Sequence, residues 1–266
     1  APQTPLSVPA GLPVIAGVVG LDDTGLLAEP HRVTDAPPAP GYRNGTPTSS
    51  YWGQRRLSAD GYAPHGQTLP STADYPYVVK GYTPAQLRSA YGLNGVAADG
   101  TGVTVAIIDA YASPTILQDA NEYSRRYGLP ELTSANFREV VPPGIYRRAA
   151  NRQHDPQGWW GEETLDVEAV HAIAPGANIV YVGAPNNRQD LDASMNHVVD
   201  KQLATIVSNS YGFAYELLPP GYVKPLNDTF IQAAAQGIGI YFSSGDDGDL
   251  SHLTGGTPFP AWPASS

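Results

Sequence analysis

Two carboxylates one helical turn apart have the clearest capacity for chemistry in this chain. Glu162 and Asp166 lie in the segment GWWGEETLDVEAVHAIAPGA, residues 158–177. In a helix that begins at Glu162, successive residues turn by about 100°, which places both carboxylates on one arc. Desolvation and like-charge repulsion raise the pKa of one member of such a pair, so the pair is suited to proton transfer. The alternative is that two acids early in a helix only complement the helix dipole.

The same periodicity predicts which side of this helix is buried. His171 falls on the opposite, polar face, and neither it nor His65 or His154 stands in an HGT-like context, which disfavours a histidine-dependent serine enzyme. The arc that the two carboxylates share holds four apolar residues: Leu165, Ala169, Ala172 and Ile173.

Polar side chains also follow three of the predicted strands. Asp109 closes the strand VTVAIID, the turn SNSYG (208–212) follows ATIVSNS, and SSGDDG (243–248), with Asp246, follows IGIYFSS. In open α/β sheets, ligands bind beyond the carboxyl ends of the strands. Each of these turns is a weak signal by itself, but three polar strand ends in one sheet favour a site at this edge.

From Tyr82 onward the chain alternates between predicted strands and helices. The strands are nearly continuous Val and Ile runs, which are typical of a parallel sheet covered on both faces. The sequence therefore predicts an α/β domain with a mostly parallel sheet. We expect strands at 103–109, 178–184, 204–210 and 238–244, and helices at 83–93, 113–129, from 162, near 189–202 and near 226–236.

Composition excludes several classes of function. The 266 residues contain no cysteine, so the chain has no thiolate zinc site, no iron–sulfur cluster and no cysteine nucleophile. A formal net charge of -10 disfavours nucleic acid as a partner, because nucleic-acid binding depends on basic side chains that neutralise phosphates. No apolar run reaches the roughly 18 residues of a membrane span, so we expect no membrane insertion.

An ordered set of segments resembles one known family. IIDAYASPTI, GEETLDVEAVHAIAPGANIVYVGA, IVSNSYG, YFSSGDDGD and FPAWPASS are similar, in this order and spacing, to the catalytic domain of the sedolisin family. Members of this family are serine carboxyl peptidases related in fold to subtilisin. The resemblance implies a subtilisin-like three-layer domain and endopeptidase activity on polypeptide substrates.

The resemblance also implies a role for each matching carboxylate. Glu162 matches the general base that takes a proton from the serine nucleophile, and Asp166 matches the acid that supports this base. Asp246 matches the acid that helps to form the oxyanion hole, and Asp109 matches an acidic residue in the hydrogen-bond network behind the pair. At Tyr211 many relatives are expected to carry Trp. A carboxylate base and a protonated oxyanion-hole acid both require an acidic medium.

The nucleophile of the family has no counterpart here. The family places it in a GGTSxSxP motif, whereas the GGT at Gly255 is followed by Pro258. Ser208, Ser210, Ser243, Ser244, Ser265 and Ser266 are not assigned as nucleophile. We expect the motif about 70 to 90 residues beyond Ser266. The calcium site that the resemblance implies would also lie beyond Ser266, and the chain alone is expected to be inactive.

The resemblance divides the chain into three parts. Residues 1–40 resemble the tail of a pro-segment, as in a zymogen, and 41–81 form a Pro/Gly-rich activation linker. Residues 82–266 correspond to the N-terminal two-thirds of the catalytic domain, whose partner would be the missing C-terminal segment of the same precursor. The implied location is secreted or extracellular, or an acidic compartment.

Two other functions remain open at this point. A glycoside hydrolase also uses two carboxylates, across a sugar-binding groove, and Trp159 and Trp160 could form a sugar platform, although packing is the simpler role for them. A chain without its nucleophile could also be an inactive interaction fragment of a peptidase fold. Activity on polysaccharide or on denatured protein would separate the first possibility from a peptidase.

Overall fold

The computed structural model describes residues 29–30, 55–57, 75–77, 83–141, 156–187, 190–214, 218, 221–245, 249, 251 and 255–266. The predicted domain boundaries, after residues 40 and 81, lie outside these ranges. Two short strands fall inside the predicted linker: β2 (Arg55–Leu57) pairs antiparallel with β3 (Tyr75–Tyr77).

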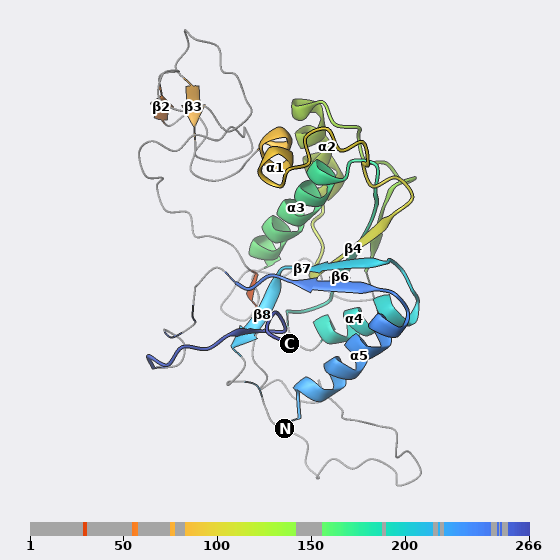
Figure 1. Cartoon of the computed structure of the whole chain (residues 1–266), viewed down its shortest axis with the longest axis vertical. Helices are drawn as coiled ribbons and strands as arrows, with labels where there is room; N and C mark the ends of the chain where they lie inside the picture. Colours follow the sequence, from red (N-terminus) through yellow and green to blue (C-terminus); the bar gives the residue numbers. More distant parts are fainter. Residues whose placement is uncertain are drawn as a thin grey trace.

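The described part of the chain is built around a five-stranded sheet in which all neighbours run parallel (Figure 1). Its spatial order is β5-β6-β4-β7-β9. The strands are β4 (Thr104–Ala110), β5 (Phe137–Val140), β6 (Asn178–Ala184), β7 (Ile206–Asn209) and β9 (Gly239–Phe242).

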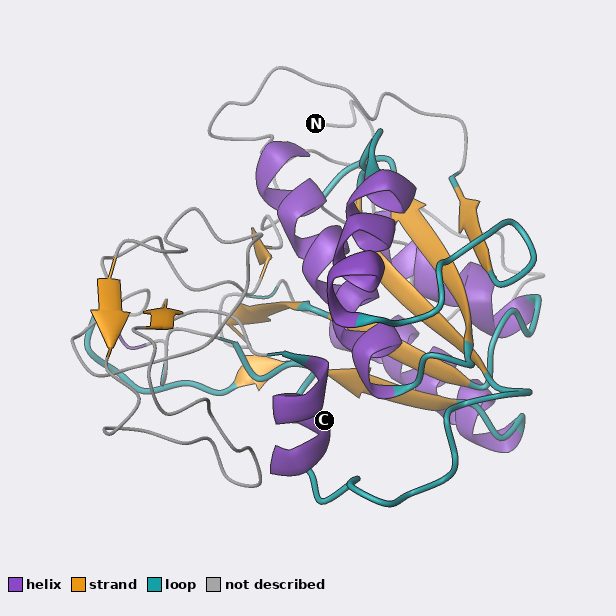
Figure 2. Cartoon of the chain, turned by 90° about the horizontal axis from the view of Figure 1, so that it is seen from above, coloured by secondary structure: helices purple, strands orange, loops and turns teal. Residues whose placement is uncertain are grey.

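Helices cover both faces of this sheet, which confirms the predicted three-layer α/β class (Figure 2). One face packs against α2 and α3, and the other against α4 and α5, while α1 lies on α3. The helices are α1 (Pro84–Ala90), α2 (Ile116–Tyr127), α3 (Pro156–Ile173), α4 (Asp190–Asp200) and α5 (Val223–Ala235).

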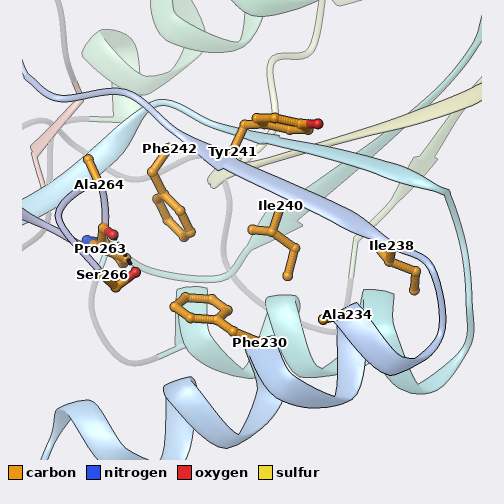
Figure 3. A pocket seen from close by; sticks show the side chains of 9 residues that line it. All are labelled: Phe230, Ala234, Ile238, Ile240, Tyr241, Phe242, Pro263, Ala264 and Ser266. Carbon is orange, nitrogen blue, oxygen red and sulfur yellow. Dashed lines mark hydrogen bonds between the residues drawn. The ribbon is translucent and has the colours of Figure 1, made fainter.

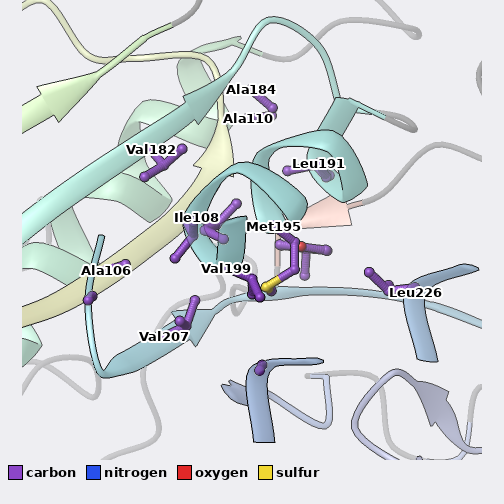
Figure 4. Close-up of a cluster of buried hydrophobic side chains, with 14 of the residues drawn as sticks. Ala106, Ile108, Ala110, Val182, Ala184, Leu191, Met195, Val199, Val207 and Leu226 are labelled. Carbon is purple, nitrogen blue, oxygen red and sulfur yellow. The ribbon is translucent and has the colours of Figure 1, made fainter. Parts of the chain in front are cut away.

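Side-chain alternation along β4 shows how the two layers form. Ile107 points to the smaller hydrophobic cluster, with Ile116 of α2 and Val167 of α3. Ile108 points to the larger cluster, with Met195 of α4 and Leu226 of α5 (Figure 4). Successive side chains of a strand face opposite sides, so a run such as VAIID is buried throughout because both faces are covered.

A second, antiparallel sheet lies beside the carboxyl end of β7. Its order is β1-β8-β10, formed by β1 (Glu29–Pro30), β8 (Tyr211–Ala214) and β10 (Ala261–Trp262). Only one residue, Ser210, separates β7 from β8. The second sheet therefore begins directly at the edge where the sequence predicts the site.

The N-terminal end of α1 is set by its sequence. Thr83 accepts a hydrogen bond from the backbone N–H of Gln86, and the Gln86 side chain accepts one from the N–H of Thr83, which together form a capping box. Arg88 of α1 donates to the carbonyl oxygen of Ile173 at 2.6 Å. This bond satisfies a backbone acceptor at the end of α3 and fixes α3 along its axis.

Candidate active site

The two predicted carboxylates are both buried on α3. Glu162 is 1% exposed and Asp166 is 6% exposed. α3 begins at Pro156, six residues before the predicted start, so Glu162 lies well inside the helix. The helix-dipole alternative therefore loses its basis for Glu162, because that effect is confined to the first turn.

The predicted buried arc of α3 is confirmed for Glu162, Asp166 and Ala172 and wrong for Leu165 and Ala169. Leu165 is 53% exposed and Ala169 is also exposed, whereas Val167 is fully buried. His171, predicted on the polar face, is 0% exposed, and its Nε2 lies 2.7 Å from the carbonyl oxygen of Pro130. The sheet thus packs against an arc of α3 that is rotated away from Leu165. His171 is buried by this packing and contacts the backbone of the loop before β5.

Asp109 faces α3 from the carboxyl end of β4. It shares the strand face of Ile107, so alternation directs its side chain toward the α2–α3 layer. Asp109 is 0% exposed, and neither carboxylate oxygen has a hydrogen-bond partner among the described residues. Burial, followed by the charges of Asp166, Glu162 and Glu163, raises its pKa well above the usual value. Asp109, predicted from its place at the end of a strand, therefore lies close to Glu162 and Asp166 of α3.

Asp166 receives a hydrogen bond from the turn between β7 and β8. The hydroxyl of Ser210 donates to Oδ1 of Asp166 at 2.9 Å. Burial raises the pKa of Asp166 to about 6, while the Ser210 hydrogen bond acts in the opposite direction. The turn SNSYG and the helix pair, separate in the sequence, thus meet in one site.

Glu163 is a buried carboxyl group that the sequence analysis did not single out. It is 0% exposed and accepts a hydrogen bond from the backbone N–H of Ser113. Burial raises its pKa to about 9, although the Ser113 hydrogen bond lowers it. Its position beside Glu162 was the only available signal, because the hydrophobic pattern of α3 did not place residue 163 on the buried side.

Together, four carboxyl groups meet where α3 crosses the carboxyl end of β4. Such a cluster cannot ionise fully, since each added negative charge in a desolvated site raises the pKa of the others. It therefore retains protons at acidic pH and can exchange them. The members are Asp109, Glu162, Glu163 and Asp166.

Asp246 lies outside the described residues, so its predicted place at the oxyanion hole stays a prediction. Ser243, three residues before Asp246, is described. Its backbone N–H donates to the carbonyl oxygen of Asn209 at 3.0 Å. The turns after β7 and β9 are therefore neighbours.

Tyr211 is buried at the start of β8. It is 0% exposed and packs edge-on against Phe242 of β9. Its hydroxyl has no hydrogen-bond partner among the described residues. Burial raises its pKa well above the usual value, with further contributions from the charges of Asp192 and Asp109.

The tryptophan pair offers no sugar platform. Trp159 is 0% exposed and belongs to the larger hydrophobic cluster, and Trp160 packs against that cluster. Stacking on a sugar needs an accessible ring face, so the observation that favoured a glycoside hydrolase is explained by packing.

Among the described residues, no group of three or more His, Asp or Glu side chains has the arrangement of a metal site. None of the helices that the structure describes combines the length and apolar character that crossing a membrane requires.

Comparisons with known proteins point to one family. The chain is 29% identical to kumamolisin of Bacillus sp. (strain MN-32) over 266 residues, which is 97% of this chain and 41% of that protein. It is 28% identical to tripeptidyl-peptidase 1 of Rattus norvegicus over 197 residues, 70% of this chain and 33% of that protein. The chain thus spans less than half the length of these curated relatives. No protein-family model matches it.

A solved structure agrees in fold. Pseudomonas sedolisin, a serine-carboxyl proteinase complexed with two molecules of pseudo-iodotyrostatin, superposes with a TM-score of 0.59 at 26% identity. The match covers 70% of this chain and 52% of that one. The relatives of this chain and its α/β architecture thus point to the same family as the motifs that contain Glu162 and Asp166. In sequence and in fold, this chain is thus similar to serine-carboxyl peptidases of the sedolisin family.

Proposed function

We propose that this chain carries the acid and base half of an acid-active serine endopeptidase site. Glu162 is the general base for a serine hydroxyl, and Asp166 orients Glu162 and shares its proton. Asp109 lies behind them as a third acid. The substrate is a polypeptide, and the reaction is hydrolysis of a peptide bond through an acyl-enzyme.

The burial of Glu162 beside Asp166 and Asp109 is the observation that carries the proposal. Two of the three acids have raised pKa values, Asp166 at about 6 and Asp109 well above its usual range. A carboxylate whose neighbours retain protons at acidic pH can accept a proton from a hydroxyl and return it to the leaving amine. The Ser210 hydrogen bond fixes one oxygen of Asp166.

An acidic medium fits the second requirement of the mechanism. In the proposal, Asp246 donates a hydrogen bond to the developing oxyanion, which it can do only while protonated. The chain leaves β9 next to the turn of Ser210, and Asp246 follows three residues after Ser243 in the sequence.

The nucleophile is proposed to come from a segment of the same precursor beyond Ser266. Within the described residues, β9 pairs with β7 on one edge, and its other edge is open. Beside this edge lies a cavity of about 440 Å³ between β9 and α5, whose lining residues include Phe230, Ile238, Ile240, Tyr241 and Ser266 (Figure 3). An open edge beside a groove of this kind suits an added strand.

The decisive experiment compares two lengths of the protein on denatured casein at pH 4. We expect no pepstatin-resistant cleavage by residues 1–266, and cleavage by a form extended through a downstream GGTSxSxP motif. In that form, Glu162→Gln and Asp166→Asn should each lower kcat by about 10²-fold or more. Turnover by residues 1–266 that resists pepstatin would show that the nucleophile lies within this chain. A rate maximum above neutral pH would exclude the carboxylate mechanism.

Calcium binding, a zymogen stage and a secreted or acidic location belong to the same proposal. Calcium would be held by residues beyond Ser266, and its removal with a chelator should lower the melting temperature of the extended form but not that of residues 1–266. A chelator effect on residues 1–266 would contradict this placement.

A further inference from the structure

Asp109 is buried without a hydrogen bond that would fix its side chain. It is 0% exposed, and both of its carboxylate oxygens lack a hydrogen-bond partner among the described residues. A carboxyl group without such a bond can turn about its side-chain torsions unless neighbouring atoms confine it. The position of Asp109 relative to Glu162 and Asp166 therefore depends on the groups that surround it.

The nearest space on β6 is filled by a backbone carbonyl group. In the parallel register of β4 and β6, Asp109 pairs with Gly183, and Ile107 pairs with Tyr181. Paired residues face the same side of the sheet, so a side chain at position 183 would lie beside Asp109. A Cβ there would be only 2.2 Å from the carbonyl oxygen of Tyr111. The Tyr111 carbonyl group thus takes the space that a side chain of β6 would otherwise fill.

Residues 111–113, here called the strap, lead from β4 toward α2 and carry this carbonyl group. Tyr111 has a backbone φ of 66°, in the left-handed region, which a residue with a side chain adopts only when its surroundings hold it there. Its backbone N–H donates to the carbonyl oxygen of Ala184 at 2.6 Å. Its carbonyl oxygen accepts a hydrogen bond from the Tyr181 hydroxyl at 2.8 Å. β6 therefore holds Tyr111 by both of its backbone polar groups.

The other end of the strap is bound to α3. The backbone N–H of Ser113 donates to Oε2 of Glu163, the residue that follows Glu162. The strap thus connects β6 to the helix that carries the carboxyl pair, and Asp109 lies two residues before it in the chain.

We propose that Tyr181 is a positioning residue for Asp109. Its hydroxyl holds the Tyr111 carbonyl group over Gly183, and the strap held in this way confines the Asp109 carboxyl group beside the carboxyl pair of α3. The inference deepens the proposed function, on which it rests for the importance of Asp109. Without the hydroxyl, Tyr111 would lose a donor to its carbonyl oxygen while keeping an unfavourable φ, so the strap would shift and admit water to Asp109.

Hydrogen exchange of two amides in residues 1–266 measures the hold on the strap. The Tyr111 amide reports opening of the strap, and the Ile107 amide, in the middle of β4, reports unfolding of the sheet. We expect Tyr181→Phe to lower the protection factor of Tyr111 relative to that of Ile107 by about threefold to tenfold, the factor that one neutral hydrogen bond contributes. Tyr123→Phe alters a buried tyrosine of α2 that packs against Tyr127, and it should leave this ratio unchanged.

The titration of Asp109 separates positioning from a purely structural role. Burial is the main cause that raises the pKa of Asp109, so water admitted by Tyr181→Phe should lower this pKa toward its usual value by about 1 or more. NMR of the Asp109 carboxyl carbon, assigned through Asp109→Asn, measures it, and Tyr123→Phe should leave it unchanged. An unchanged Asp109 titration in Tyr181→Phe would overturn the inference, even if that variant is less stable.

A double variant tests whether the hydroxyl acts through Tyr111. The Tyr181 hydroxyl also lies within hydrogen-bonding reach of Glu163. Glu163→Gln keeps an acceptor for the Ser113 amide, so in this background Tyr181→Phe should lower the protection of Tyr111 by the same factor as in the unsubstituted protein. Loss of the effect in Glu163→Gln would show that the hydroxyl acts through Glu163, which would contradict the assignment.

These measurements distinguish the inference from the proposed function, because exchange and titration are read without substrate. In an active extended protein, Tyr181→Phe should lower kcat and leave KM nearly unchanged, since Asp109 is proposed to lie behind the carboxyl pair and not against the substrate. An unchanged kcat there would also overturn the inference. If the strap and Asp109 respond as expected but the extended protein cleaves no polypeptide, Tyr181 positions a buried acid in a protein with another activity.

Discussion

The Ser210 hydroxyl lies 2.9 Å from Oδ1 of Asp166 and donates to it, which joins the turn after β7 to the carboxyl pair of α3. The bond fixes the positions of the Ser210 hydroxyl and of one Asp166 oxygen relative to each other. This contact also ties the second sheet, which begins at Tyr211, to the helix that carries Glu162.

Ser210→Ala should raise the pKa of Asp166 further above its value of about 6. The lost hydrogen bond stabilises the carboxylate form, and a bond to a charged group contributes about 1.5–3 kcal/mol, which corresponds to about one to two pKa units. The carboxyl carbon of Asp166, followed by NMR through a pH titration, reports the change. Ser208→Ala, two residues earlier in β7, is the matched control and should leave this titration unchanged.

Asp109→Asn should stabilise the fold relative to the unsubstituted protein, and by more at neutral pH than at acidic pH. Burial keeps Asp109 protonated in the folded state, so in the unsubstituted protein stability is lost as pH rises above the unfolded pKa of about 3.9. An amide cannot ionise, and the stability difference between variant and parent should therefore grow by up to about 1.4 kcal/mol per pH unit. Urea unfolding at pH 4.5 and 7.5 measures it; a difference that shrinks with pH would contradict the assignment.

The whole chain should lose stability between pH 5 and pH 7. Asp166, Glu163 and Asp192 have folded pKa values of about 6, about 9 and about 7, all above their unfolded values, so the folded state binds more protons than the unfolded state. Each such group lowers the free energy of unfolding by up to about 1.4 kcal/mol per pH unit as pH rises toward its folded pKa. The lowered pKa of His171 acts in the other direction, but among the described residues it opposes three groups. A thermal midpoint that rises from pH 5 to pH 7 would contradict this expectation.

Gly183→Ala should destabilise the protein by about 3 kcal/mol or more, because the new Cβ would overlap the backbone oxygen of Tyr111 at 2.2 Å and backbone cannot move aside cheaply. Gly161→Ala is the control. Gly161 is an exposed residue of α3 with no atom near the position of a new Cβ, so the substitution should stabilise the helix by about 0.5–1 kcal/mol. Urea unfolding at pH 5 compares the two; equal effects would show that the backbone at Tyr111 can move away from β6.

The sequence was sufficient for the elements that carry the site. β6 agrees with its predicted range and β4 is shifted by one residue, because a parallel strand buried on both faces leaves an uninterrupted run of Val, Ile and Ala. Glu162, Asp166 and Asp109 were found from spacing and strand ends, and the structure brings them together. β5 and β8 were missed, since four-residue strands such as FREV leave no pattern that differs from a loop.

Tertiary structure alone decided which arc of α3 is buried. The sequence pattern favoured Leu165, but the packing of α3 between the sheet, α1 and α2 buries Glu163 and His171 and leaves Leu165 exposed. Periodicity measures where apolar side chains gather, and on a helix that buries several carboxyl groups the buried arc is not the most apolar one. The sequence by itself thus determined which residues could do the chemistry. Packing decided which of them lose water, and therefore which retain a proton.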